Sequence, residues 1–239
     1  MGKAVIVLGD ARSGTSITSG ILQAIGVDMN GNSGRKCNGN PNGAFEDRTV
    51  LHKTVAWKQE LDKGATIEQL RAKYGDWVKK WVQARKNSLW GWKSAQTHYS
   101  IDLVMPYLEQ PHFVLVYRNP FHQAISLQVG NDREISHSTD ASLLSRERRV
   151  SAANTLHYMK VISTGHKILE SILERYPQVP FMIVAKEDIA DDPCTIAESL
   201  CAFLQVPCTD ITKKRVNEVV IKKYSSWKKG GVKVDWGKR

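Results

Sequence analysis

The sequence predicts an α/β fold, a three-layer sandwich in which helices cover both faces of a mostly parallel central sheet. Two observations predict it. Short apolar segments alternate along the chain with segments of helical periodicity, which is the pattern of βαβ units. The apolar segments are also nearly continuous, as in strands that are buried on both faces. The chain has 239 residues, 41% hydrophobic, with seven Trp, so we expect one domain over residues 1–239 with a sizeable core.

Four segments have the composition of buried strands. In chain order they are Ala4–Leu8, Ser88–Lys93, His112–Tyr117 and Pro180–Ala185. Other segments carry apolar residues at helical spacing, and the expected helices are Ser16–Ile25, Asp47–Leu61, Thr66–Arg85, Ile101–Leu108 and Ser142–Arg175. A last helix starts at Asp192-Pro193, because proline is favourable in the first helical turn.

Three segments have the composition of loops or tails. Met29–Gly43 is rich in Asn and Gly, and loops of this kind either carry function or are mobile. Val129–Asp140 is expected to be a second mobile segment. A basic, Gly-containing C-terminal tail is expected from residue 225 onward.

The charge balance points to anionic ligands. Lys and Arg number 34 against 24 Asp and Glu, which gives a net charge of +10. Such an excess suits a phosphorylated cofactor, an acidic substrate, nucleic acid or an anionic lipid. The net charge alone does not choose among them.

The spacing of the cysteines and the length of the apolar runs argue against a zinc protein, a disulfide-rich protein and a membrane-spanning protein. The four cysteines form no CxxC pair and have no His at zinc spacing, so no metal site or disulfide framework is indicated; they are Cys37, Cys194, Cys201 and Cys208. No stretch reaches the roughly 18 apolar residues that a membrane span needs. The first strand begins about three residues from Met1, which leaves no room for a signal peptide. We expect a cytoplasmic protein without integral membrane association.

The segment Gly9–Ser16 has the features of a phosphate-binding loop. It lies between the first strand and a helix, where unpaired backbone N–H groups and the positive end of the helix dipole attract anions. Nucleotide triphosphate sites of this kind read GxxxxGK[ST]. Here Gly9 and Gly14 keep the glycine spacing, but Thr15 replaces the Lys and the basic residue is Arg12. The predicted fold therefore resembles that of P-loop nucleoside triphosphate hydrolases, with a loop poorly suited to a metal-bound triphosphate; an ordinary βα turn is the alternative.

A second anion motif follows the third strand. Arg118 comes directly after Tyr117, and Ser126 comes eight residues later, about two turns into a helix that Pro120 starts. Ligands of open α/β sheets bind outside the carboxyl ends of the strands, so Arg118 is expected to share a crevice with the phosphate loop. The planar donors of Arg suit phosphate. A structural pairing of Arg118 with a carboxylate is the alternative.

These motifs together resemble the sulfotransferase superfamily, whose members use 3′-phosphoadenosine-5′-phosphosulfate (PAPS) as sulfuryl donor. In that family a loop like Ala11–Ser16, with a basic residue at the position of Arg12, holds the 5′-phosphosulfate. An Arg-Asn-Pro segment followed by Ser, like Arg118 and Ser126, holds the 3′-phosphate. The resemblance implies the donor-binding residues, which are Arg12, Ser13, Gly14, Thr15, Ser16, Arg118 and Ser126.

Further segments extend the resemblance from residue 5 to about residue 207. Asn40–Asp47 is similar to the Asn-Pro-x-Gly-(aromatic)-(aromatic)-Glu-Asp segment of bacterial members, and Trp90–Lys93 to their Trp-Gly-x-Lys strand. Lys186–Leu204 is similar to their Tyr-Glu-Asp-Leu…Asp-Pro…Phe-Leu stretch, with Lys186 in place of the Tyr. The tail faintly resembles a clasp that some members close over the nucleotide.

The implied reaction is in-line transfer of a sulfuryl group from PAPS to a hydroxyl or amine, without a metal. A sulfate bears less charge than a terminal phosphate, which fits a loop that lacks its Lys. Positioned cations would stabilise the loose transition state; Arg12 and Lys93 are the expected ones. The general base is expected to be Glu46, at a position where bacterial relatives place a Glu, or His98, because animal relatives use a His soon after a strand Lys. His52 is a third candidate.

Two other functional classes remain open. A small-molecule kinase would share the phosphate loop, but it normally needs the missing Lys and a Mg²⁺ carboxylate. A non-catalytic adenosine-nucleotide binding protein would also fit the charge. A nucleic-acid partner is not expected, because the basic residues are scattered and no aromatic-interleaved motif is present. The expected acceptor is a small molecule, a saccharide or a lipid, in a pocket shaped by Met29–Gly43, Val129–Asp140 and Thr66–Arg85 with Trp77 and Trp81; the two Trp side chains alternatively belong to the core.

Overall fold

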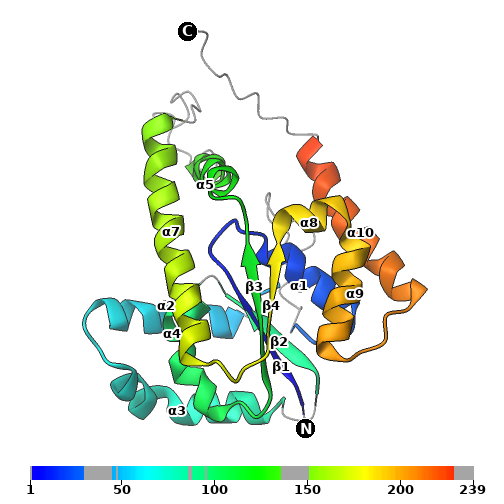
Figure 1. Ribbon diagram of the computed structural model, residues 1–239. Coiled ribbons are helices and arrows are strands. Elements are labelled where there is room, and N and C mark those ends of the chain that lie inside the picture. The colour runs from blue at the N-terminus through cyan, green and yellow to red at the C-terminus, as the bar shows by residue number, and fades with distance from the viewer. Residues whose placement is uncertain are drawn as a thin grey trace.

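A parallel four-stranded sheet forms the centre of the computed structural model, with strand order β2-β1-β3-β4 (Figure 1). The structure describes residues 2–29, 45–46, 48–85, 88–94, 96–135 and 151–228. The strands are β1 (Ala4–Leu8), β2 (Trp90–Lys93), β3 (Pro111–Tyr117) and β4 (Phe181–Ala185). All three strand pairings are parallel, so the predicted α/β class is confirmed.

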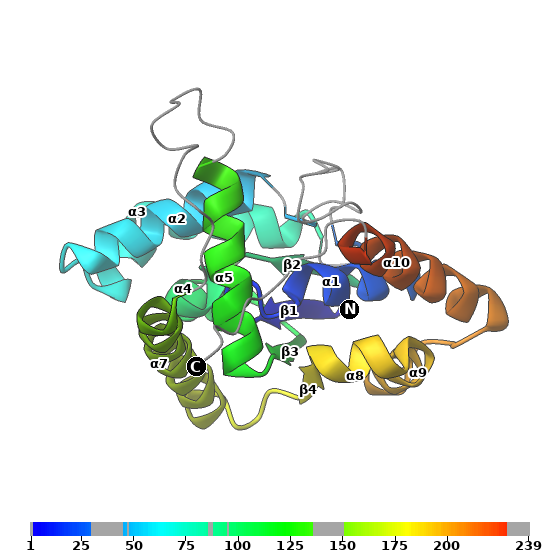
Figure 2. The same ribbon diagram turned by 90° about the horizontal axis from the view of Figure 1, so that it is seen from above.

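Helices cover both faces of the sheet, as Figure 2 shows from above. One face is covered by α1 (Thr15–Ala24), α9 (Pro193–Leu204) and α10 (Asp210–Lys228). The other face is covered by α2 (Arg48–Asp62), α3 (Ile67–Gln83), α4 (Thr97–Val104) and α7 (Ala152–Arg175). Two more helices, α5 (Pro120–Ile135) and α8 (Lys186–Asp191), begin where β3 and β4 end.

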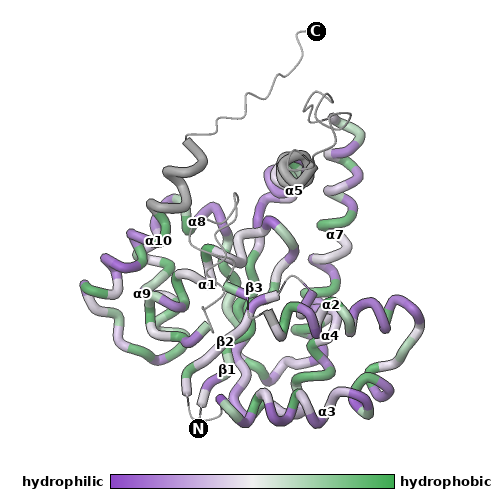
Figure 3. Tube along the Cα trace, turned by 180° about the vertical axis from the view of Figure 1, so that it is seen from behind, coloured by the Kyte–Doolittle hydropathy of each residue, from purple (hydrophilic) through white to green (hydrophobic). Residues whose placement is uncertain are grey.

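The strand side chains divide between two hydrophobic cores. In β1, Val5 and Val7 pack toward α1, whereas Ile6 and Leu8 pack toward the α2–α4 layer. All four are at most 1% exposed. Burial on both faces explains why the strand sequences are continuous apolar runs. Along the helices, green hydrophobic residues recur among purple hydrophilic ones in Figure 3, as helices with one buried face require.

Tryptophans fill much of the second core. Trp81 of α3 meets both β2 rings edge-on, with centroids 5.1 Å from Trp90 and 5.1 Å from Trp92. Trp77 stacks on Trp81 at 5.9 Å and also meets Trp57 of α2. Edge-to-face and offset-stacked rings at these distances are favourable. The Trp pair of α3 therefore belongs to the core, which was one of its two sequence interpretations.

Several element bounds differ from the expected ones. The helix expected over Ile101–Leu108 begins earlier, as α4, and ends as a 3₁₀ turn over Met105–Tyr107 that contains Pro106. The helix start at Asp192-Pro193 is confirmed: Asp192 Oδ1 accepts the backbone N–H groups of Cys194 and Thr195, each at 3.1 Å. Pattern reasoning missed α8, whose six residues are too few for a clear period, and α10.

Several expectations fall outside the described residues. These are residues 30–43 of the first expected loop, which include Cys37, residues 136–140 of the second, residues 142–150 of the long helix expected over Ser142–Arg175, and the tail beyond 228. The first part of the second expected loop, Val129–Ile135, is helical and belongs to α5. Within the described part of the chain, α10 continues through Lys228, so the residues from 225 to 228 are helical. None of the helices described in the structure is both long and apolar enough to cross a membrane.

Candidate functional site

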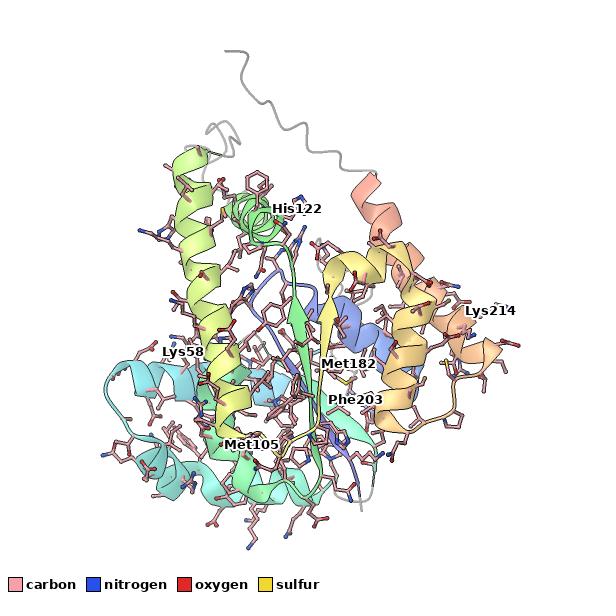
Figure 4. The ribbon with its side chains drawn as sticks, viewed as in Figure 1. Lys58, Met105, His122, Met182, Phe203 and Lys214 are labelled. Atoms are coloured by element: carbon pink, nitrogen blue, oxygen red, sulfur yellow. The ribbon has the colours of Figure 1, made fainter. Side chains whose placement is uncertain are left out.

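Basic residues gather where the four strands end. Arg12 lies in the loop after β1, Lys93 is the last residue of β2, and Arg118 and Lys186 directly follow β3 and β4. Because all four strands run parallel, their carboxyl ends meet at one edge of the sheet. Figure 4 shows this edge near His122, at the start of α5, and Met105 toward the opposite end. Sequence reasoning assigned three of these cations to the site and gave no role to Lys186.

The loop between β1 and α1 has the conformation that its glycines predict. Gly14 has φ 117°, in the left-handed region, and caps α1 by accepting the N–H groups of Ile17 and Thr18 at 3.0 and 3.1 Å. A Cβ on Gly9 would lie 2.8 Å from the carbonyl oxygen of Val116 in β3, so the close approach of β3 requires glycine there. Neither glycine places a side chain of its own at the start of α1, where backbone amides attract anions.

The predicted loop hydroxyls line this turn. The side chains of Ser13, Thr15 and Ser16 are buried, at 0%, 6% and 8% exposure. The hydroxyl of Ser13 has no hydrogen-bond partner among the described atoms, although it is buried. A buried hydroxyl without a partner is costly, so this atom is a candidate contact for a bound anion.

The β3–α5 segment holds the loop from the other side. Arg118 Nη1 donates to the backbone oxygen of Arg12 at 3.1 Å, and Gln123 Nε2 donates to the backbone oxygen of Ala11 at 2.9 Å. The Arg12 guanidinium donates in turn through Nε to Ser126 Oγ at 3.2 Å. The structure thus brings the two predicted anion motifs into one cluster.

Lys186 packs against the same turn. A Cβ on Gly14 would lie 3.0 Å from its Cγ and 3.1 Å from its Cβ, so the stem of Lys186 covers the start of α1. The pKa of Lys186 is lowered to about 7, chiefly by burial and then by the nearby Arg118 charge. Arg12 lowers this pKa as well, whereas Glu187 raises it.

Glu46 and Lys93 form an ion pair beside the loop. Lys93 Nζ lies 2.8 Å from Glu46 Oε1, and their side chains are 6% and 18% exposed. Lys93 pairs with Val7 in the sheet register, next to the strand end that leads into the phosphate loop. Two residues that the sequence assigned to catalysis therefore meet, although 47 positions separate them.

His98 faces Asp10 instead. Its Nε2 lies 3.5 Å from Asp10 Oδ1, and the imidazole side chain is 1% exposed. Burial raises the pKa of Asp10 to about 6. The pKa of His98 is lowered to about 4, mainly by burial and further by Lys58. Gly165 of α7 permits this arrangement, because any Cβ there would overlap the Asp10 carboxylate. The third candidate base, His52, is exposed on α2.

The side chains gathered at this edge could bind an anion and accept protons beside it. In the described part of the chain, no group of three or more His, Cys, Asp and Glu side chains is placed to hold a metal. A hollow of about 570 Å³ lies at the opposite end of the sheet, where its lining residues include Asp102, Met105, Pro111, Tyr176 and Pro180. That hollow is separate from the cation cluster.

Comparisons with known proteins identify the family and the fold. The model of the sulfotransferase family matches residues 4–210. The crystal structure of sulfotransferase STF9 from Mycobacterium avium superposes with a TM-score of 0.52 at 12% identity, covering 90% of this chain and 67% of that one.

Two further solved structures are similar. The sulfotransferase domain from the curacin biosynthetic pathway has a TM-score of 0.48 at 13% identity, covering 89% of this chain and 77% of that one. The sulfotransferase domain from the Synechococcus PCC 7002 olefin synthase has a TM-score of 0.48 at 17% identity, covering 88% of this chain and 75% of that one. No curated protein matches in sequence. Because the family model spans most of its length, this chain belongs to the sulfotransferase family.

Proposed function

We propose that this sulfotransferase transfers a sulfuryl group from PAPS to a hydroxyl or amine of a small-molecule, saccharide or lipid acceptor, in line and without a metal. One observation carries the proposal: Arg12, Arg118 and Ser126 are joined by hydrogen bonds around a phosphate loop that has Thr15 in place of Lys. Such a loop supplies amides and guanidinium groups for anions, without the Lys that a triphosphate site uses.

The cluster offers two adjoining places for anionic groups. The amides at the start of α1, the Arg12 side chain and the hydroxyls of Ser13, Thr15 and Ser16 would hold the 5′-phosphosulfate. Arg118 and Ser126 would hold the 3′-phosphate. Because Ser126 already accepts from Arg12, the side chain that positions the transferring group is itself positioned by the 3′-phosphate site.

Lys93 and Glu46 are proposed to act on the transferring group and the acceptor. In transfer, the bond from sulfur to the phosphate oxygen breaks while a bond from sulfur to the acceptor oxygen forms. Charge develops on the leaving phosphate, and Arg12 and Lys93 would stabilise it. The acceptor proton would pass to the Glu46 carboxylate, which lies 2.8 Å from Lys93 Nζ. His98 is the alternative base; a pKa of about 4 leaves its imidazole neutral at pH 7, but makes it a weaker base than an ordinary histidine.

The test is calorimetric titration of the metal-free protein with 3′-phosphoadenosine-5′-phosphate (PAP), the product nucleotide. ADP, and ATP with Mg²⁺, serve as comparators, and the series is repeated on Arg118→Ala. We expect tight binding of PAP that needs no metal and is weakened in the variant. A preference for ATP with Mg²⁺ would overturn the proposal in favour of a small-molecule kinase. PAP binding without turnover over a broad acceptor panel would support a non-catalytic nucleotide-binding role.

A further inference from the structure

The end of β4 carries a basic residue that the proposed donor site does not yet use. The register aligns Tyr117 of β3 with Ala185 of β4. The residues that follow them, Arg118 and Lys186, therefore leave neighbouring strands at the same level and the same edge. The position of Lys186 is fixed by the sheet itself, since a residue next to a strand end has little freedom to move away.

Packing brings Lys186 to the phosphate loop as well. Its Cβ, Cγ and Cδ would lie 3.1, 3.0 and 3.3 Å from a Cβ on Gly14, so its aliphatic stem runs along the first turn of α1. Gly14 has a positive φ of 117° and no side chain, and this leaves room for the stem. Lys186 is thus held between the start of α1, where amides attract anions, and Arg118 at the end of β3.

The charges around Lys186 favour the binding of an anionic ligand. Arg118 and, more weakly, Arg12 oppose its protonation, whereas Glu187, on the same short helix α8, favours it. Glu187 also accepts the backbone N–H of Asn119 at 3.2 Å, which ties α8 to the segment after β3. Together with burial, these groups leave Lys186 with a pKa of about 7. A bound phosphate would reverse the repulsion and favour the ammonium form.

We infer that Lys186 is a third cation of the donor site, which binds the 3′-phosphate together with Arg118. Proton uptake on binding is the measurable consequence of a cation in these surroundings. This inference rests on the proposed function and names the group that recognises one part of the donor. The 3′-phosphate is its target because Arg118, which is proposed to hold that group, follows Tyr117 just as Lys186 follows Ala185, and the register pairs those two strand residues. The backbone amides of α1 serve the 5′ end instead.

Proton-linked calorimetry tests this inference. PAP is titrated at about pH 8 in two buffers of different ionisation enthalpy, and the difference in apparent binding enthalpy gives the protons taken up. Phosphate monoesters have a second pKa near 6, so at about pH 8 the nucleotide is already deprotonated and uptake reports on the protein. We expect the wild type to take up close to one proton.

Three variants separate the possible causes. Lys186→Met should take up no proton and bind PAP at least about tenfold more weakly, as expected for losing a hydrogen bond to a charged group. The same variant should bind AMP, which lacks the 3′-phosphate, with nearly wild-type affinity. Lys186→Arg should keep PAP binding without proton uptake, because Arg stays charged. Lys214→Met, an exposed position on α10 that Figure 4 shows far from the strand ends, is the control with the same loss of charge.

Other results would contradict the role of Lys186, its assignment to the 3′-phosphate, or the proposed function itself. If Lys186→Met keeps the proton uptake and affinity of Lys214→Met, Lys186 is not part of the site. If Lys186→Met weakens the binding of AMP and of PAP equally, the residue contacts the 5′ end of the nucleotide and the assignment to the 3′-phosphate fails. If the wild type does not bind PAP without metal, the proposed function fails and the inference fails with it. Arg118→Ala, measured alongside, distinguishes these cases, because it loses PAP binding only when the donor site exists.

Discussion

Arg12 links the two halves of the candidate site through both its backbone and its side chain. Its φ of 67° is unusual for a residue with a side chain, and such conformations persist where the surroundings fix them. Arg118 and Ser126 supply those surroundings, one bonded to the carbonyl of Arg12 and the other to its guanidinium. A guanidinium held in this way is oriented before any ligand arrives, which lowers the cost of binding.

Glu46→Gln tests which residue removes the acceptor proton. General base catalysis contributes about 10²- to 10⁴-fold, so we expect kcat to fall by about 100-fold or more while PAP affinity changes little. His98→Asn should reduce kcat less, because the buried imidazole faces Asp10. Steady-state kinetics with PAPS and a reactive acceptor measure both, with Glu174→Gln and His157→Asn as exposed controls on α7. A larger loss in His98→Asn than in Glu46→Gln would assign the base to His98.

Asp10→Asn should change how stability depends on pH. Burial raises the pKa of Asp10 from 3.8 to about 6, so the folded state favours the protonated carboxyl more than the unfolded state does. This stabilisation is complete below pH 3.8 and is lost as the pH rises through about 6. Asn does not titrate, so the stability of the variant relative to wild type should rise by about 2 to 3 kcal/mol between these limits. Urea unfolding from pH 4 to 8 measures it; a pH-independent difference would show that Asp10 is not desolvated.

Among the helices, α3 shows how a side-chain stripe that suggests a binding pocket can be core instead. Its tryptophans recur at a spacing of four and so share one face, and that face meets β2 and α2. Helix periodicity identifies the face, but it does not say whether protein or ligand covers it. The opposite case is α8, whose six residues carry no usable period although its first residue lies at the site.

Trp81→Ala should destabilise the fold without affecting the donor site. The side chain is 8% exposed and contacts three other Trp rings, so its removal leaves a cavity that costs about 3–5 kcal/mol. Chemical unfolding followed by tryptophan fluorescence measures the loss, with Lys80→Ala, exposed on the same helix, as control. PAP affinity measured on folded protein should stay at the wild-type value. A destabilisation below about 1 kcal/mol would contradict the assignment of Trp81 to the core.

At the scale of the whole molecule, the sequence predicted those features that depend on local residue patterns and on the common direction of the strands. The strands were predictable because each is an apolar run buried on both faces. The convergence of Arg12, Lys93 and Arg118 followed because parallel strands end at one edge. The contact between His98 and Asp10 was not predictable, since it depends on how α4 and α7 pack and on a glycine at 165 that lets the carboxylate approach. The spacing of apolar residues in α4 and α7 does not show how closely the two helices approach Asp10.

Occupancy of the proposed donor site should stabilise the whole chain. The cluster joins the β1–α1 loop, the β3–α5 segment and the start of α8, which are far apart in sequence, so a ligand bound there ties together elements that separate on unfolding. A ligand that binds only the folded state at 100 times its Kd adds about 2.7 kcal/mol to the free energy of unfolding. For a chain of this size each kcal/mol raises Tm by about 2–4 °C, so PAP should raise Tm by roughly 5–11 °C.

The dependence of this shift on metal and phosphate position makes it diagnostic. Thermal unfolding is measured with PAP, with AMP and with ATP plus Mg²⁺, each in the presence and absence of EDTA. Because guanidinium and ammonium groups, together with α1 amides, are the proposed ligands of the phosphates, EDTA should leave the PAP shift unchanged. AMP should give a smaller shift, because the Arg118 side of the cluster would remain empty. A shift that appears only with Mg²⁺ would mean that the loop binds a metal-bound nucleotide despite Thr15, and the cation cluster would then belong to a phosphotransfer site.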